Sequence, residues 1–177
     1  MKRILGIDPG SVVTGYGVVD SDGVRDFHIA NGSLRIKGDA LPQKLGFILA
    51  EVTALIEQWQ PAEVAIDSVF VSKNPMSALK LGQARGAAIC AAVQLGLPVY
   101  EYAPKAIKQA AVGYGSADKG QMQEMIRILL NLEVLPKPDA ADGLAVAICH
   151  AHTGGSVNYL RSASGGRRKS KRWTSVP

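Results

Sequence analysis

The chain has 177 residues, of which 47% are hydrophobic and 20% are charged. This length suits one domain with one core, and the composition excludes disorder as the main state. Its apolar runs are too short to span a membrane and its N-terminus lacks a secretory apolar segment, so we expect a cytoplasmic protein. The two cysteines, Cys90 and Cys149, form neither a disulfide framework nor a metal-binding pair, and we expect both to be buried.

The net charge of +5 is distributed unevenly along the chain. Residues 1–67 carry a net charge of −3, 68–120 carry +4, 121–160 carry −2, and 161–177 carry +6. The last stretch has no apolar periodicity, which predicts a basic, disordered tail over 157–177 after a folded domain over 1–156. Such a tail can bind a polyanion loosely or simply aid solubility. The basic stretch inside the domain is therefore more informative than the overall charge.

The apolar pattern predicts three strands, followed by helices that alternate with strands. The first strands are expected over 3–7, 15–19 and 24–36, and short turns between them make them antiparallel neighbours. The later elements are expected to be a helix over 41–59, a strand over 63–68, a helix over 74–95, a strand over 98–102, and helices over 104–112, 118–130 and 139–152. Strands that alternate with helices pair in parallel, so the sequence predicts one α/β domain with a mixed five-stranded sheet.

Four carboxylates stand at special places in this pattern. Asp8 ends the first strand, Asp67 ends the fourth, and Asp139 and Asp142 open the last helix. Singly, each has an ordinary structural role as a turn residue, a strand-end acceptor or a helix cap. Together they predict a site, because strands that lie side by side end at the same edge and residues three apart share a helix face.

The chemistry of this cluster favours a divalent cation. Several carboxylates in one cleft repel each other unless a cation neutralises them, and ligands that are all oxygen select hard ions such as Mg²⁺ or Mn²⁺. The usual use of such a site is phosphate chemistry, often with two metal ions. His150 and His152 are two residues apart, point to different faces of a helix, and are expected to be helix-end residues rather than ligands.

The basic stretch lies between Asp67 and Asp139. Its lysines beside the cleft are candidates to follow a nucleic-acid backbone, although solvated lysines are the ordinary alternative. Phe70 follows Asp67 in a loop, where an exposed ring can stack on bases, with ordinary packing as its alternative. The DNA-binding candidates are Phe70, Lys73, Lys105, Lys108 and Lys119.

Several segments match a known family. They include Leu5-Gly-Ile-Asp-Pro-Gly-Ser11, Thr14-Gly-Tyr-Gly-Val18, the run Ser77-Ala-Leu-Lys-Leu-Gly-Gln-Ala-Arg-Gly86, and Asp139-Ala-Ala-Asp-Gly-Leu-Ala145. On these motifs the chain resembles the RuvC-type crossover junction endodeoxyribonucleases, over roughly residues 2 to 152. The first motif alone would be weak evidence, since sugar kinases share such turns, but the run over 77–86 and the start of the last helix are specific.

The resemblance implies an RNase H-like fold and a homodimer that resolves Holliday junctions in recombination and DNA repair. It implies symmetric cleavage of two opposite strands with Mg²⁺ or Mn²⁺, leaving ends that can be ligated. Our hypothesis for the mechanism is hydrolysis with two ions per active site, which gives 5′-phosphate and 3′-hydroxyl ends. It also implies a partnership with a branch-migration motor complex. The family's acidic quartet falls on Asp8, Asp67, Asp139 and Asp142. Its base-contacting aromatic falls on Phe70, and its two functional lysines fall on Lys108 and Lys119.

The chain departs from the family pattern at one of these positions, where Asp67 replaces a glutamate. Aspartate is one methylene shorter, and a misplacement of about 1 Å can cost about 100-fold in rate. Asp67 is either a natural variant with compensating neighbours or a change introduced to weaken cleavage. The alternative function is therefore a junction-binding protein with little or no cleavage. A phosphate-loop ATPase or sugar kinase needs two such domains and fits this length poorly.

Overall fold

The structure is a computed structural model that describes residues 1–68, 74–113, 115, 118–153 and 159–160. The strands are β1 (Lys2–Asp8), β2 (Val13–Ser21), β3 (Asp26–Arg35), β4 (Glu63–Asp67), β5 (Val99–Tyr102) and β6 (Tyr159–Leu160). The helices are α1 (Leu41–Trp59), α2 (Pro75–Gln94), α3 (Pro104–Val112), α4 (Lys119–Leu129) and α5 (Pro138–Thr153). Each of the ten elements predicted from the sequence is present, with ends that differ by a few residues.

The strands form one mixed sheet in the order β3-β2-β1-β4-β5-β6. The first three strands pair antiparallel, and β4 and β5 add to β1 in parallel. This is the predicted arrangement of three antiparallel strands and two parallel strands. The two-residue β6 pairs antiparallel with β5 at the edge. It lies beyond residue 156, where the predicted tail begins, and the division into a domain and a tail stays a prediction.

Local sequence signals explain where the elements begin. The tight turn between β2 and β3 uses Gly23, whose φ is +89°, and Asp22, whose carboxylate accepts hydrogen bonds from the backbone amides of Val24 and Arg25. Helix α2 starts at Pro75, with the Asn74 side chain as its cap, since that side chain accepts from the backbone N–H of Met76 at 3.0 Å. Proline fits the first helical position because its missing N–H would have no helical partner there.

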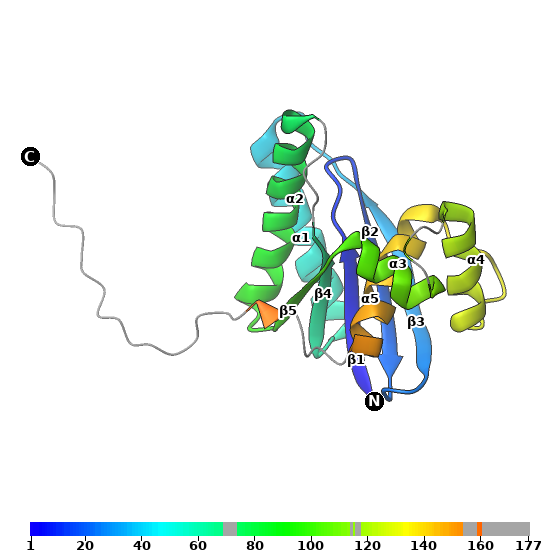
Figure 1. The fold of residues 1–177 in the computed structure, drawn as a ribbon. Coiled ribbons are helices and arrows are strands. Elements are labelled where there is room, and N and C mark those ends of the chain that lie inside the picture. The colour runs from blue at the N-terminus through cyan, green and yellow to red at the C-terminus, as the bar shows by residue number, and fades with distance from the viewer. Residues whose placement is uncertain (69–73, 114, 116–117, 154–158, 161–177) are drawn as a thin grey trace, which may run out of the picture.

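The sheet is covered on both faces, which produces two apolar cores. Helices α1 and α2 lie on one face, while α3, α4 and α5 lie on the other (Figure 1). Strand residues alternate between the cores: Leu5 and Ile7 face the first pair of helices, whereas Ile4 faces α5. By the same alternation Asp8 belongs to the α5 face of the sheet, which places its carboxylate near the helix that carries two further acids.

Helix α5 approaches the sheet unusually closely, because glycines line the strands beneath it. A Cβ atom on Gly6 would lie 2.3 Å from the carbonyl oxygen of Gly143, and one on Gly15 would lie 1.9 Å from that of Asp139. Neither distance is tolerable for a real side chain, so these positions require glycine. The Gly-rich first two strands therefore set how far the start of α5 stands from the end of β1.

One expectation about the cysteines is wrong. Cys149 is buried as predicted, but Cys90 is exposed on α2. The buried face of α2 includes Ala88, Ala91 and Ala92, and Cys90 is two residues after Ala88, about 200° around the helix. Within the described part of the chain, no helix has both the length and the apolar character needed to cross a membrane.

Candidate active site

Two of the predicted carboxylates lie on neighbouring strands at the same edge of the sheet. Asp8 is the last residue of β1 and Asp67 the last residue of β4, and the parallel pairing brings Ile7 opposite Ile66. Asp67 is also paired across the sheet with Tyr102 of β5. Both carboxylates therefore stand where the strands end and the chain turns away, as the sequence predicted.

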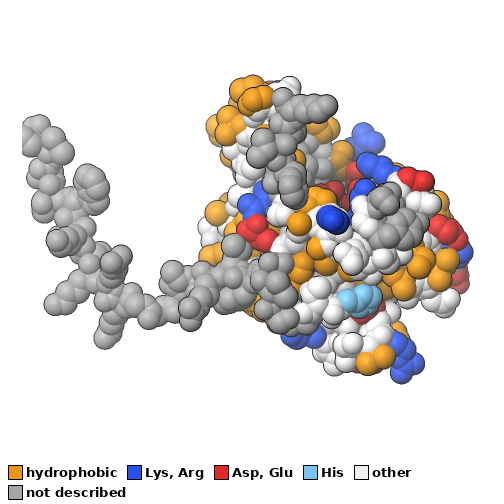
Figure 2. All heavy atoms as spheres, viewed as in Figure 1, with side chains coloured by type: hydrophobic (Ala, Val, Ile, Leu, Met, Phe, Trp, Pro, Cys, Tyr) orange, Lys and Arg blue, Asp and Glu red, His pale blue; other side chains and the backbone are white. Residues whose placement is uncertain are grey.

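The last helix brings further carboxylates to this edge. Asp139 lies in the first turn of α5 and Asp142 one turn later. A small cavity of about 140 Å³ is lined by Asp8, Asp67 and Asp142 together with Lys108. Its other walls are apolar and are formed by Pro104, Ile107, Met122 and Val146. Figure 2 shows acidic and basic side chains close together in the hollow between the upper end of α2 and the α3–α4 region.

Burial, and then the neighbouring negative charges, raise the pKa values of three of these carboxyls. Burial raises the pKa of Asp8 to about 7, and the negative charges of Asp142 and Asp139 act in the same direction. Burial likewise raises the pKa of Asp67 to about 7, with Asp8 and Asp142 contributing. The pKa of Asp142 is also raised, chiefly by burial. Carboxyls held apart from water and next to each other take up protons in the absence of a cation.

The ligand set at this cavity fits a hard divalent cation. It consists of oxygen atoms, and Oδ1 of Asp67 is buried without a hydrogen-bond partner in the described part of the structure. A buried acceptor without a partner is costly, and a cation would satisfy it. As the described side chains lie, however, no group of three or more His, Cys, Asp or Glu residues is close enough to hold an ion. A bound cation must therefore draw the carboxylates closer together.

The structure brings two of the predicted lysines to this site. Lys108 of α3 lines the cavity and lowers the pKa of Asp142. Lys119, the first residue of α4, is exposed, and its charge lowers the pKa values of Asp8 and Asp142. Lys105 lies one turn before Lys108 on α3 and does not line this cavity. The predicted DNA contacts Phe70 and Lys73 lie outside the described residues.

Sequence reasoning counted Arg85 only among the six basic residues of 68–120, as a candidate phosphate track, and the structure places it beside the site. Its guanidinium forms an ion pair with Glu101 of β5, and its charge lowers the pKa of Asp67. Arg85 belongs to α2, on the opposite face of the sheet from α5, so its charge acts on Asp67 from the other side of the sheet. The signal in the sequence was a single charged residue in a stretch of α2 rich in alanine and glycine.

The fold and the acidic edge formed by Asp8, Asp67, Asp139 and Asp142 together define a nuclease of the RNase H-like class. The particular family follows from direct comparison: the chain belongs to the crossover junction endodeoxyribonuclease RuvC family, whose family model matches residues 4–150. The RuvC protein of Psychromonas ingrahamii is 56% identical over 157 residues, which cover 89% of this chain and 91% of that protein. The resemblance seen in the motifs is thus confirmed over the folded body of the chain.

Solved structures agree with this assignment. Thermus thermophilus RuvC in complex with a Holliday junction substrate matches with a TM-score of 0.84 at 33% identity, over 90% of this chain and all of that one. The yeast mitochondrial Holliday junction resolvase matches with a TM-score of 0.62 at 12% identity, over 85% of this chain and 79% of that one. The second match shows a common fold, and the RNase H-like arrangement predicted for the sheet is confirmed.

Proposed function

We propose that this chain resolves four-way DNA junctions by metal-dependent hydrolysis of two phosphodiester bonds, in the cytoplasm and during recombination and repair. The observation that carries the proposal is the convergence of Asp8, Asp67, Asp142 and Lys108 around one cavity in a chain of this family. The junction is the substrate in the solved Thermus thermophilus complex, which is 33% identical. We propose products with 5′-phosphate and 3′-hydroxyl ends.

Four carboxylates are proposed to hold the metal, namely Asp8, Asp67, Asp139 and Asp142. When bound, Mg²⁺ or Mn²⁺, proposed as two ions, would supply an activated water and neutralise charge on the scissile phosphate. The raised pKa values of Asp8 and Asp67 support this role, because they report a site that disfavours its own ionised form without a cation. A cation would release those protons and hold both groups ionised.

The lysines are proposed to bind the substrate. Lys108 at the cavity wall and Lys119 at the start of α4 place positive charge beside the carboxylates, and such cations stabilise the negative charge of a phosphoryl group in the transition state. Lys105, Lys73 and Phe70 are proposed as further DNA contacts. The first two would bind phosphates and the ring would stack on a base.

Symmetric cleavage of two strands needs two active sites, so we propose that the chain acts as a homodimer on the junction. Met76 and Leu79 are 59% and 55% exposed on α2, which supports this helix as part of the dimer interface. A partnership with a branch-migration motor complex is proposed from the family alone.

The test is a nicking assay on a four-way junction and on a linear duplex of the same sequence, with Mg²⁺ or Mn²⁺. We expect metal-dependent cleavage of the junction and little of the duplex. Asp8→Asn should abolish cleavage and retain junction binding. The matched control is Asp22→Asn, because Asp22 accepts two backbone hydrogen bonds in an exposed turn and asparagine can accept them too. Full cleavage by Asp8→Asn, or junction binding by the wild type without cleavage, would contradict the proposal.

A further inference from the structure

A chain of hydrogen bonds around the buried His150 connects α5 to Glu63 at the start of β4, four residues before Asp67, and to Tyr102 at the end of β5. His150 is 2% exposed, its Nε2 lies 2.6 Å from Oε2 of Glu63, and its Nδ1 lies 2.6 Å from the Tyr102 hydroxyl. The Thr153 hydroxyl donates to that same hydroxyl at 3.1 Å, and Lys2 donates to Oε1 of Glu63 at 2.9 Å. The Tyr100 ring packs on the imidazole with 4.4 Å between ring centroids.

The donors and acceptors in these hydrogen bonds are those that a neutral imidazole on His150 requires. Burial lowers the pKa of His150. If Nε2 carries the proton and donates to Glu63, Nδ1 accepts from the Tyr102 hydroxyl, whose oxygen accepts from Thr153. Each polar group then has a partner of the right kind, which favours one fixed geometry over several alternatives.

The spacing along the two elements relates this chain of bonds to the carboxylates. On β4, Glu63 and Asp67 are four residues apart and share the face toward α5, so their Cα atoms are about 13 Å apart. On α5, His150 and Asp142 are eight residues apart and lie on one face, about 12 Å along the axis. The strand runs toward the cavity while the helix runs away from it. Glu63 therefore lies about as far from Asp67 along β4 as His150 lies from Asp142 along α5.

We propose that His150 is a positioning residue, whose contacts with Glu63 and Tyr102 fix the register of α5 on the sheet and thereby the placement of Asp142 opposite Asp67. This inference rests on the proposed function of the carboxylate cavity as a metal site. A helix that slips by one residue moves about 1.5 Å along its axis and turns by about 100°, which would carry Asp142 away from the cavity. The close approaches at Gly6 and Gly143 set the depth of α5 and restrict the register of its first half, and the His150 contacts would hold the register of its second half.

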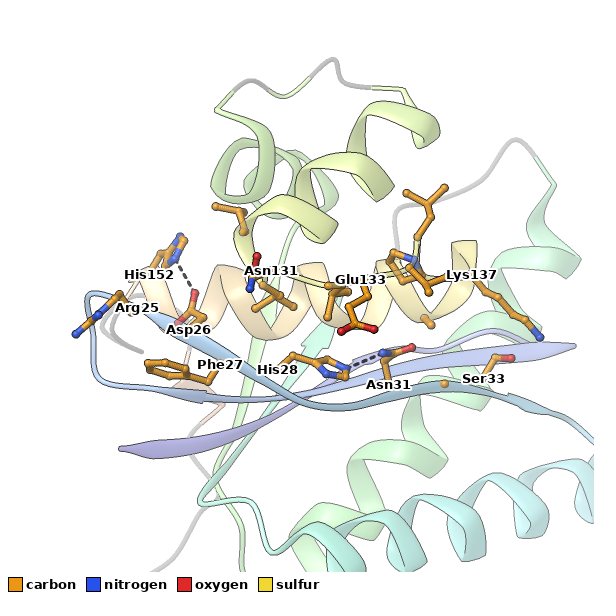
Figure 3. A pocket seen from close by; sticks show the side chains of 18 of the residues that line it. Arg25, Asp26, Phe27, His28, Asn31, Ser33, Asn131, Glu133, Lys137 and His152 are labelled. Atoms are coloured by element: carbon orange, nitrogen blue, oxygen red, sulfur yellow. Dashed lines mark hydrogen bonds and ion pairs between the residues drawn. The ribbon is translucent and has the colours of Figure 1, made fainter.

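The test measures Mn²⁺ binding to the full chain by electron paramagnetic resonance, without DNA. In His150→Phe the ring volume is kept and both hydrogen bonds are lost, and we expect the Mn²⁺ dissociation constant to rise about tenfold. The matched control is His152→Phe. His152 lies on the same helix and pairs at 2.8 Å with Asp26 (Figure 3), which belongs to the edge strand β3, separated from β4 by β2 and β1. We expect the control to change the dissociation constant by less than about twofold.

A purely structural role would give a different pattern. It would lower the unfolding temperature of His150→Phe and leave its Mn²⁺ affinity at the wild-type value, and that result would overturn the inference. Tyr102→Phe removes one of the two hydrogen bonds and serves if His150→Phe does not fold. We expect it to raise the dissociation constant about threefold, and an unchanged value would also count against the inference.

The same measurements separate this inference from the proposed function. Wild-type chain that binds Mn²⁺ tightly but does not cut junctions would contradict the proposed activity, while a loss of affinity in His150→Phe would still support the positioning role. Wild-type chain that does not bind Mn²⁺ in this assay would overturn both.

Discussion

Replacing Asp8 by asparagine should stabilise the metal-free protein at neutral and alkaline pH. The pKa of Asp8 is about 7 in the folded chain, because of burial and the charges of Asp142 and Asp139, against an ordinary aspartate value of 3.8. Each pKa unit corresponds to about 1.4 kcal/mol, so ionised Asp8 costs up to about 4 kcal/mol in the folded state. Asparagine has nearly the same shape and carries no charge, so the cost is removed.

The sign of the pH dependence follows from proton binding. Between pH 4 and pH 7 the folded chain holds a proton on Asp8 that the unfolded chain has released. The stability of the wild type without metal therefore falls as pH rises through this interval. Asp8→Asn lacks this pH dependence. The free energies of unfolding of the two proteins should therefore diverge from pH 4 upward and differ by a constant amount above pH 7.

The assay is thermal unfolding in EDTA at pH 5 and pH 8. The amide of the variant must also find hydrogen-bond partners, so we expect its gain in stability to be about half of that upper limit, about 2 kcal/mol. For a domain of this size, this gain corresponds to a rise of about 4–8 °C in Tm at pH 8. The difference should be smaller at pH 5, and Mg²⁺ should reduce it at pH 8 by stabilising the wild type alone. Equal Tm values in EDTA at pH 8, or the same difference at both pH values, would refute the electrostatic reasoning.

Three further substitutions test other parts of the site. Gly6→Ala should destabilise the chain by about 3 kcal/mol in chemical denaturation, since the new methyl would lie 2.3 Å from the Gly143 carbonyl oxygen; wild-type stability would show that α5 can move away at no cost. Asp67→Glu should cut junctions faster than the wild type under saturating Mg²⁺, and equal rates would mean that neighbours compensate for the shorter side chain. Lys119→Ala should lower the cleavage rate and shift the acidic limb of the pH–rate profile upward, because this lysine lowers the pKa of Asp8; an unmoved limb would exclude that coupling.

The fold could be predicted nearly completely because its signals are local. Alternating apolar residues define the strands and prolines mark the helix starts at Pro75 and Pro104, so the element ends agree with the structure within a few residues. Sequence patterns alone do not specify contacts between distant elements. The exposure of Cys90 was missed because it depends on which face of α2 packs inward, and the weak periodicity of a helix rich in alanine and glycine leaves that face undefined.

In the candidate site, too, the residues with local signals could be predicted and the contacts between distant elements could not. Asp8 and Asp67 could be placed because each ends a strand, and strands that are neighbours bring their ends together. The effect of Arg85 on Asp67 could not be foreseen, since that residue approaches from the other face of the sheet. The contact of His150 with Glu63 joins positions 87 residues apart, and a histidine near a helix end gives no local sign of a buried partner.

The site balances repulsion among its carboxylates against the packing of α5 on the sheet. The acidic edge works against folding in the absence of metal, because two carboxyls with pKa values near 7 resist ionisation. The rest of the domain must therefore hold Asp142 beside Asp8 and Asp67 although the charges repel. Glycines at positions 6 and 15 let the backbone of α5 approach the sheet closely, and packing of this kind does not weaken as pH rises. Backbone packing thus keeps these carboxyls near one another without a cation, and a cation that drew them closer would relieve their repulsion and stabilise the folded chain.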